Sequence, residues 1–119
     1  MDALEAYARD WDAAFDHKPF YFTQEFWYLL VNCTIKHWQG APLTVSAATQ
    51  LMKSGSNRTR EERIKKAMAD GYLMKQQSAT DGREFVVIPS NKLSDLMVGH
   101  FSRTLQITLD ALEAIRPKH

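Results

Sequence analysis

Several features that direct a functional assignment are scarce or missing in this 119-residue chain. Cys33 is the only cysteine, so no intramolecular disulfide can form. Its apolar neighbours favour a buried structural thiol over the alternative of a redox switch. No apolar run reaches the roughly 18 residues that a membrane span needs, and the acidic start lacks the basic region of a signal peptide. These absences, with a 45% hydrophobic content, favour a cytoplasmic protein that folds as a single domain over residues 1–119.

Motifs for catalysis and for cofactor binding are also missing. The four histidines (His17, His37, His100 and His119) are far apart and lack the spacing of metal ligands. Cys33 has no recognisable base partner, and the chain has neither a glycine-rich phosphate loop nor a serine-centred nucleophile elbow. The sequence therefore predicts no enzyme activity, no metal and no cofactor.

Charge is nearly balanced overall but is unevenly distributed. The formal net charge is +1. Residues 1–52 hold three Lys or Arg against six Asp or Glu, residues 53–84 hold eight against five, and residues 85–119 hold four against three. Phosphate binding requires a local excess of basic residues, although many solvated helix faces have the same composition. The middle of the chain is therefore the expected contact region for an anionic partner.

Hydrophobic periodicity predicts long helices towards both ends of the chain. Apolar residues recur at three- and four-residue steps over about residues 2–15, 23–39 and 91–115. The last helix should be about 37 Å long at 1.5 Å per residue, which is more than this small core can cover. The second helix is apolar on more than one stripe, so both helices imply a second protein surface and a homodimer. The candidate interface residues, for which core packing within one subunit is an equal alternative, are Leu4, Trp11, Phe101, Leu105, Leu109 and Leu112.

Two shorter helices are expected in the basic middle of the chain. A connection at residues 42–44 leads into the first, at about residues 45–52. The second covers about residues 57–69, with Ser56 or Asn57 as its cap. Gly55, in the turn between them, can take a positive φ at no steric cost. Two short helices joined by a tight glycine-containing turn indicate a helix-turn-helix.

A β hairpin is expected after the helix-turn-helix. Two β-favouring runs, at about residues 74–78 and 84–89, flank a turn at Asp81-Gly82 and predict a two-stranded wing. The fold class is therefore mainly α with a small β part (α+β), a winged helix-turn-helix with flanking N- and C-terminal dimerisation helices. The expected division is N-terminal helices over 1–40, the helix-turn-helix and wing over 41–89, and the C-terminal dimerisation helix over 90–119.

Four stretches of the chain together resemble the DNA-binding lobe of the MarR family of bacterial transcription regulators. They are Leu43–Met52, Ser56–Ile64, Ala69–Leu73 and Thr80–Arg83. The helices before and after them are arranged as in that family, where they form the dimer. By this resemblance, Ser56 and Thr59 open the recognition helix, Ile64 and Ala67 are its buried positions, Arg83 is a wing arginine that enters the minor groove, and Asp81 steadies that arginine.

Arg60 and Glu62 depart from the family pattern. Arg60 occupies a position that is usually apolar in the family, and Glu62 occupies one where a polar or basic side chain often meets the DNA. An acidic side chain beside phosphate is repelled unless it accepts from a cytosine amino group or pairs with a neighbour such as Arg58 or Lys66. The sequence leaves both alternatives open.

The second short helix is expected to enter the major groove of double-stranded DNA, which is about 12 Å wide and admits one helix. Asn57 can bridge an adenine, Arg58 can grip a guanine, and Lys65 is placed for phosphate. Lys53, Lys66 and Lys75 are expected to make positioning contacts only. The full predicted DNA-binding set is Ser56, Asn57, Arg58, Thr59, Glu61, Glu62, Lys65, Lys66 and Arg83.

The sequence therefore predicts a sequence-specific, DNA-binding transcription regulator that acts as a homodimer. The alternative is a winged-helix protein-interaction module without specific DNA binding, which the two acidic residues Glu61 and Glu62 and the modest charge favour. The resemblance also implies a small aromatic effector, since family members commonly bind one between the dimer helices and the DNA lobe. It places Trp27, Tyr28, Trp38 and His100 near such a pocket, with ordinary core packing as the alternative.

Overall fold

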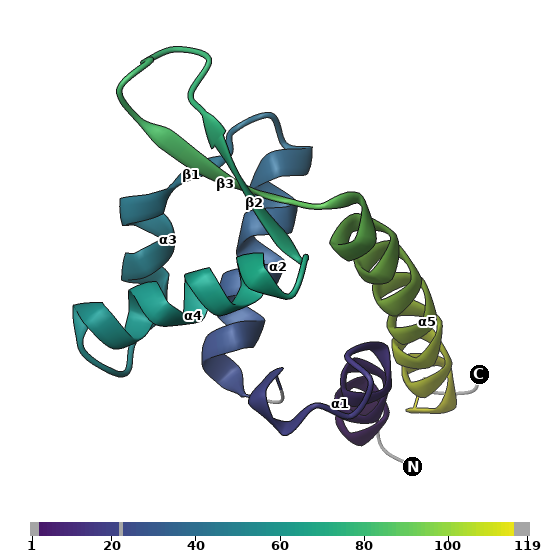
Figure 1. The fold of residues 1–119 in the computed structure, drawn as a ribbon. Helices are drawn as coiled ribbons and strands as arrows, with labels where there is room; N and C mark the ends of the chain where they lie inside the picture. The colour runs from purple at the N-terminus through teal and green to yellow at the C-terminus, as the bar shows by residue number, and fades with distance from the viewer. Residues whose placement is uncertain (1–2, 22, 116–119) are drawn as a thin grey trace. The chain divides into compact units, whose positions relative to one another are not determined.

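The chain forms two compact units. The structure, a computed structural model, describes residues 3–21 and 23–115. The helical unit contains Met1–Phe22 and Leu96–His119, and the central unit contains Thr23–Asp95. The last helix, α5 (Asn91–Ile115), begins in the central unit and continues into the helical unit. Figure 1 shows the order of the elements along the chain.

Aromatic packing organises the helical unit. Besides α5, this unit contains α1 (Ala3–Ala14) and a short 3-10 helix, η1 (Pro19–Tyr21). The Trp11 indole N–H donates a hydrogen bond to the backbone carbonyl of Tyr21 at 3.0 Å, and the Phe15 and Tyr21 rings stack with their centroids 5.3 Å apart. All three side chains are buried. Of the two alternatives that the sequence left open for Trp11, the structure supports core packing, because its indole is buried within the chain.

The central unit contains the helix-turn-helix and a small sheet. Its first helix, α2 (Gln24–Trp38), begins after Thr23, whose hydroxyl accepts a hydrogen bond from the Phe26 backbone N–H at 3.3 Å. The predicted helices and wing strands are all present, and their ends lie within about one residue of the expected positions. The other elements are β1 (Leu43–Thr44), α3 (Val45–Leu51), α4 (Asn57–Ala69), β2 (Leu73–Gln77) and β3 (Phe85–Pro89).

The sheet has three antiparallel strands, one more than the sequence predicted. Its order is β1-β3-β2, and Val87 in the middle strand lies between Leu43 and Lys75. Residues 42–44 were expected to form a connection, because a strand of two residues carries no alternating pattern. Since β1 leads directly into α3, its pairing with β3 ties the start of the helix-turn-helix to the wing.

Cys33 lies on the buried side of α2. Its side chain is fully buried, and burial raises the pKa of its thiol to about 12. The thiol therefore stays protonated near neutral pH, and a protonated thiol is a poor nucleophile. The predicted burial of Cys33 is therefore confirmed.

Neither a membrane helix nor a metal cluster is found in the part of the chain that the structure describes. None of its helices is both long and apolar enough to cross a bilayer. Within the same residues, no group of three His, Cys, Asp or Glu side chains could hold a metal ion. His119 lies outside the described residues.

Candidate nucleic-acid interface

Two hydroxyl caps and one glycine build the helix-turn-helix. Thr44 caps α3 and Ser56 caps α4, each accepting a hydrogen bond from the backbone N–H three residues further on, at 3.1 Å and 3.2 Å. Gly55 has a φ of 93°, and a Cβ there would lie 3.1 Å from Cγ2 of Thr59. The turn therefore needs glycine at this position, as the sequence predicted.

The turn between α3 and α4 is tied to α2 by two charged side chains. Arg63 donates from Nη1 to the Ser54 carbonyl at 2.7 Å, and the Glu25 carboxylate accepts from the Ser54 backbone N–H at 3.2 Å. The Arg63 and Glu25 charges are themselves 3.7 Å apart, and their side chains are only 19% and 13% exposed. These contacts fix the turn, and with it the direction in which α4 leaves. Sequence reasoning missed them because no local pattern links residues so far apart in the chain.

The N-terminal half of α4 is open to solvent. Ile64 and Ala67 are buried, as the resemblance implied, and they hold the opposite side of the helix in the core. Arg58 and Glu62 form an ion pair of 3.2 Å, which is the pairing that the sequence left open for Glu62. The exposed residues, called the α4 face from here on, are Ser56, Asn57, Arg58, Thr59, Glu61, Glu62, Lys65 and Lys66.

Two hollows lie beside the α4 face. One has a volume of about 300 Å³ and is shared by α3 and α4. The other, of about 200 Å³, is lined by α4 and by Lys75 of β2. Sequence reasoning missed the α3 side of this surface, although Ser46 and Gln50 are polar residues one helical turn apart. The lining residues are Val45, Ser46, Thr49, Gln50, Asn57 and Glu61 in the first hollow, and Val45, Glu61, Ile64, Lys65, Met68 and Lys75 in the second.

The wing ends in a loop that projects from the sheet (Figure 1). Arg83 is exposed in this loop. The Asp81 carboxylate accepts a hydrogen bond from the Arg83 backbone N–H at 3.0 Å. The resemblance implied that Asp81 steadies Arg83, and this contact restrains the arginine through its backbone.

Two of the three predicted positioning lysines lie beside aromatic rings, and the third, Lys66, pairs with Asp70 at 3.2 Å. The Lys75 ammonium is 4.9 Å from the centre of the Phe85 ring in the wing, and the Lys53 ammonium is 5.6 Å from the centre of the Tyr28 ring. Both lysines are exposed. A cation over a ring face is held weakly, and it remains able to contact a phosphate.

The four residues predicted to bind an effector are distributed over both units. Trp27 and Tyr28 are half-buried neighbours on α2, with ring centroids 5.4 Å apart. Trp38 is 46% exposed and lies eleven residues further along α2, about 16 Å from Trp27. His100 is fully buried in the helical unit. Effector binding by these residues stays a prediction.

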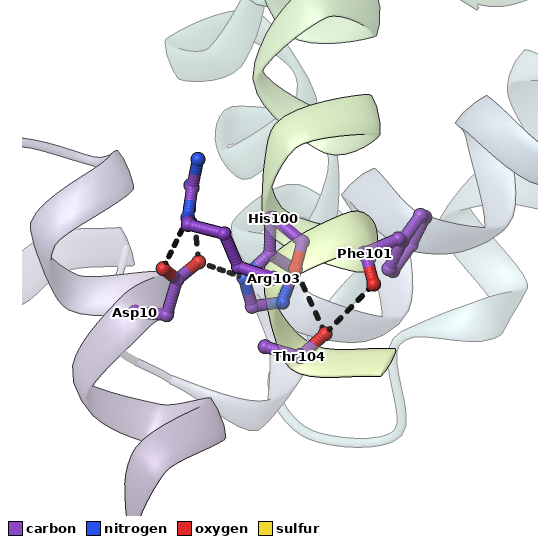
Figure 2. A network of polar contacts seen from close by, with 5 residues as sticks. All are labelled: Asp10, His100, Phe101, Arg103 and Thr104. Carbon is purple, nitrogen blue, oxygen red and sulfur yellow. Dashed lines mark hydrogen bonds and ion pairs between the residues drawn. The ribbon is translucent and has the colours of Figure 1, made fainter. Parts of the chain in front are cut away.

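His100 belongs to a polar cluster in the helical unit, shown in Figure 2. The Asp10 carboxylate on α1 is 2.6 Å from Nδ1 of His100, and it accepts two hydrogen bonds from Arg103, at 2.5 Å and 3.2 Å. Thr104 donates to the His100 carbonyl at 2.8 Å. The cluster therefore links α1 to α5 inside this unit.

The cluster favours a neutral His100. Burial lowers the pKa of His100, and the hydrogen bond with Asp10 offsets only part of this effect. Nε2 of His100 is buried and has no hydrogen-bond partner among the described residues. A neutral ring that donates from Nδ1 to Asp10 fits these observations. Burial raises the pKa of Asp10, but hydrogen bonds from Arg103 and His100 outweigh it, so the net shift is downward and the carboxylate stays ionised.

An apolar stripe on α5 is exposed. Val98, Leu105 and Leu112 are spaced seven residues apart and are 54%, 59% and 55% exposed. Leu109, one turn after Leu105, is 49% exposed. On α1, Leu4 is 78% exposed. Of the predicted interface residues, the four leucines are therefore exposed, and Phe101 is half-buried.

Comparisons with known proteins identify the fold. No protein-family model and no curated protein sequence matches this chain. The transcriptional regulator Tm0710 from Thermotoga maritima is 14% identical, with a TM-score of 0.62 over 96% of this chain and 75% of that one. The transcriptional regulator SlyA is 16% identical, with a TM-score of 0.54 over 95% of this chain and 78% of that one. A MarR-like transcription regulator from Bacillus cereus is 15% identical, with a TM-score of 0.50 over 98% and 78%.

These likenesses confirm the predicted fold class. Identities this low are evidence of fold alone, because one fold hosts many functions. The chain has a MarR-like winged-helix fold, which is mainly helical with a small antiparallel sheet.

Proposed function

We propose that this chain is a sequence-specific, double-stranded DNA-binding transcription regulator that acts as a homodimer. The observation that carries the proposal is the α4 face, a row of polar and charged side chains on the second helix of a helix-turn-helix. The major groove admits such a helix, and the side chains at its N-terminal end reach the base edges. Asn57 and Arg58 stand at that end and are exposed.

The wing supports the same function. Arg83 is exposed in a loop that projects from the sheet, and it packs into no core. A cation in this position suits the narrow, electronegative minor groove, which adjoins the major groove that α4 would enter. Lys65 and Lys75 flank the hollow between α4 and the wing, where they can meet phosphates.

Dimerisation is part of the proposed mechanism. Successive turns of one groove are about 34 Å apart, so two lobes related by a two-fold axis can read a palindromic site that one lobe reads poorly. The exposed stripe of Val98, Leu105, Leu109 and Leu112 on α5 is the surface we assign to the partner copy. Sedimentation of the purified chain should show a dimer, and Leu105→Lys should shift it to monomer by burying a charge at the interface. A wild-type chain that sediments as a monomer would contradict this assignment.

A protein-interaction module is the second candidate, favoured by the two acidic residues Glu61 and Glu62 on the exposed side of α4. Titration of the full chain against a mixed duplex at several salt concentrations separates the two functions. Phosphate contacts release counterions, so the logarithm of the affinity should fall linearly with the logarithm of the salt concentration. Absence of binding, or an affinity independent of salt, would favour the interaction module.

A further inference from the structure

Glu61 is a carboxylate on the α4 face that has no polar partner among the described residues, unlike its neighbour Glu62. On the same helix, Arg58 pairs with Glu62, and Lys66 pairs with Asp70 at 3.2 Å. Within residues 3–21 and 23–115, the Glu61 carboxylate has neither an ion pair nor a hydrogen bond. Its two oxygens are therefore available as hydrogen-bond acceptors for a ligand.

The position of Glu61 sets which ligand groups it can meet. It is the fifth residue of α4, and it lines both hollows beside the α4 face. One hollow brings it beside Gln50 and Asn57, and the other beside Lys65 and Lys75. Glu61 thus lies where the helix-turn-helix is concave, between side chains that suit bases and side chains that suit phosphates.

A carboxylate accepts hydrogen bonds and cannot donate them, and this restricts the bases that it tolerates in a major groove. Guanine presents two acceptors there, and thymine presents an acceptor and a methyl group. Adenine presents a donor beside an acceptor, whereas cytosine presents its amino donor. When DNA excludes water from the groove, a carboxylate without a donor is costly, and one facing an acceptor is repelled. Cytosine is therefore the base that a free carboxylate selects.

We infer that Glu61 determines specificity by accepting a hydrogen bond from a cytosine amino group in each half-site. This inference rests on the proposed DNA-binding function and adds the base that one residue reads. Glu62 does not share the role, because its carboxylate is already paired with Arg58. A glutamine at position 61 reads adenine instead, since its amide can donate to N7 and accept from N6.

The test is recovery of bound fragments from a random duplex pool by the full-length wild type and by Glu61→Gln, Glu61→Ala and Glu62→Gln. The wild-type motif should contain one fixed cytosine in each half-site. That base should become adenine with Glu61→Gln and lose its preference with Glu61→Ala. Glu62→Gln, which removes the same charge one residue away, should keep the cytosine. The ratio of affinities for duplexes with cytosine and with adenine at that position should change by about tenfold or more between the wild type and Glu61→Gln.

The outcomes separate this inference from the function on which it rests. A wild-type motif that Glu61→Gln leaves unchanged overturns the role of Glu61 while DNA recognition stands. If Glu62→Gln changes the preferred base and Glu61→Gln does not, Glu62 selects the base and the inference named the wrong residue. A wild type that enriches no motif removes both the inference and sequence-specific DNA binding.

Discussion

The α4 face and the polar cluster of the helical unit each contain a side-chain pair that includes a carboxylate, but the two pairs differ in burial. Arg58 and Glu62 on α4 are 89% and 61% exposed, whereas His100 and Asp10 are 0% and 16% exposed. Water competes for both groups of an exposed ion pair, so the pair contributes little to stability. Removing one partner of a buried pair leaves the other without compensation. The comparison therefore assigns ligand contact to Arg58 on the exposed face and structural support to the buried contact of Asp10 with His100.

The largest expected effect is on stability, from Asp10→Ala. The change leaves the buried His100 without its acceptor and takes two hydrogen bonds from Arg103. We expect the free energy of unfolding to fall by about 2 kcal/mol, measured by urea denaturation, because a buried donor is left unsatisfied. The matched control is Arg58→Ala, which should change it by less than about 0.5 kcal/mol. Equal losses of unfolding free energy in the two variants would show that the buried cluster is no more important for stability than the exposed ion pair.

The second prediction concerns DNA affinity, for which the exposed Arg58 should matter although it contributes little to stability. Arg58→Ala should weaken binding to a recovered site by about 1 to 3 kcal/mol and relax the preference at one base pair, if the arginine grips a guanine. Fluorescence anisotropy with duplexes altered at single positions measures both effects. An equal loss on every sequence would show that Arg58 contacts a phosphate instead.

A smaller effect is expected from the wing. Arg83→Ala should reduce affinity by about 1 kcal/mol and lower the salt slope by about one unit, because one cation no longer displaces counterions. The unfolding midpoint and the oligomeric state should stay at wild-type values, since the side chain is exposed. Unchanged affinity and slope would remove the wing from the interface.

The smallest effect concerns the pH dependence of stability. Burial lowers the pKa of His100 in the folded chain below its ordinary value of 6.5, so below about pH 6.5 the unfolded chain binds more protons than the folded one. The free energy of unfolding should therefore fall as the pH drops from 7.5 to 5.5. His100→Gln keeps a donor for Asp10 but does not titrate, and it should flatten this part of the profile. A wild-type profile that is flat, or that rises towards acid, would contradict the neutral state of His100.

Sequence reasoning located the local features and missed the distant ones. The cap at Ser56 and the turn at Gly55 depend on neighbours within a few residues, so residue type alone predicts them. The two-residue strand β1 carries no periodic pattern of its own and forms only through its pairing with β3. Its absence from the prediction follows from its length.

For the candidate site, too, the sequence predicted the local features and missed the long-range contacts. Every residue assigned to the α4 face is exposed, because helical periodicity separates this side from buried Ile64 and Ala67. The contacts of Glu25 and Arg63 with the turn, and that of Asp10 with His100, join residues far apart in the chain. A single sequence contains no signal for such pairs, so they required the folded structure.

The most direct test of the account is to map which backbone amides a recovered duplex protects from hydrogen exchange in the full chain. We predict added protection at residues 56–66 and 81–83, with no change at residues 3–14, where α1 carries Asp10. Binding that leaves residues 56–66 unprotected, or that protects only the helical unit, would contradict the assignment of the α4 face as the DNA-binding surface.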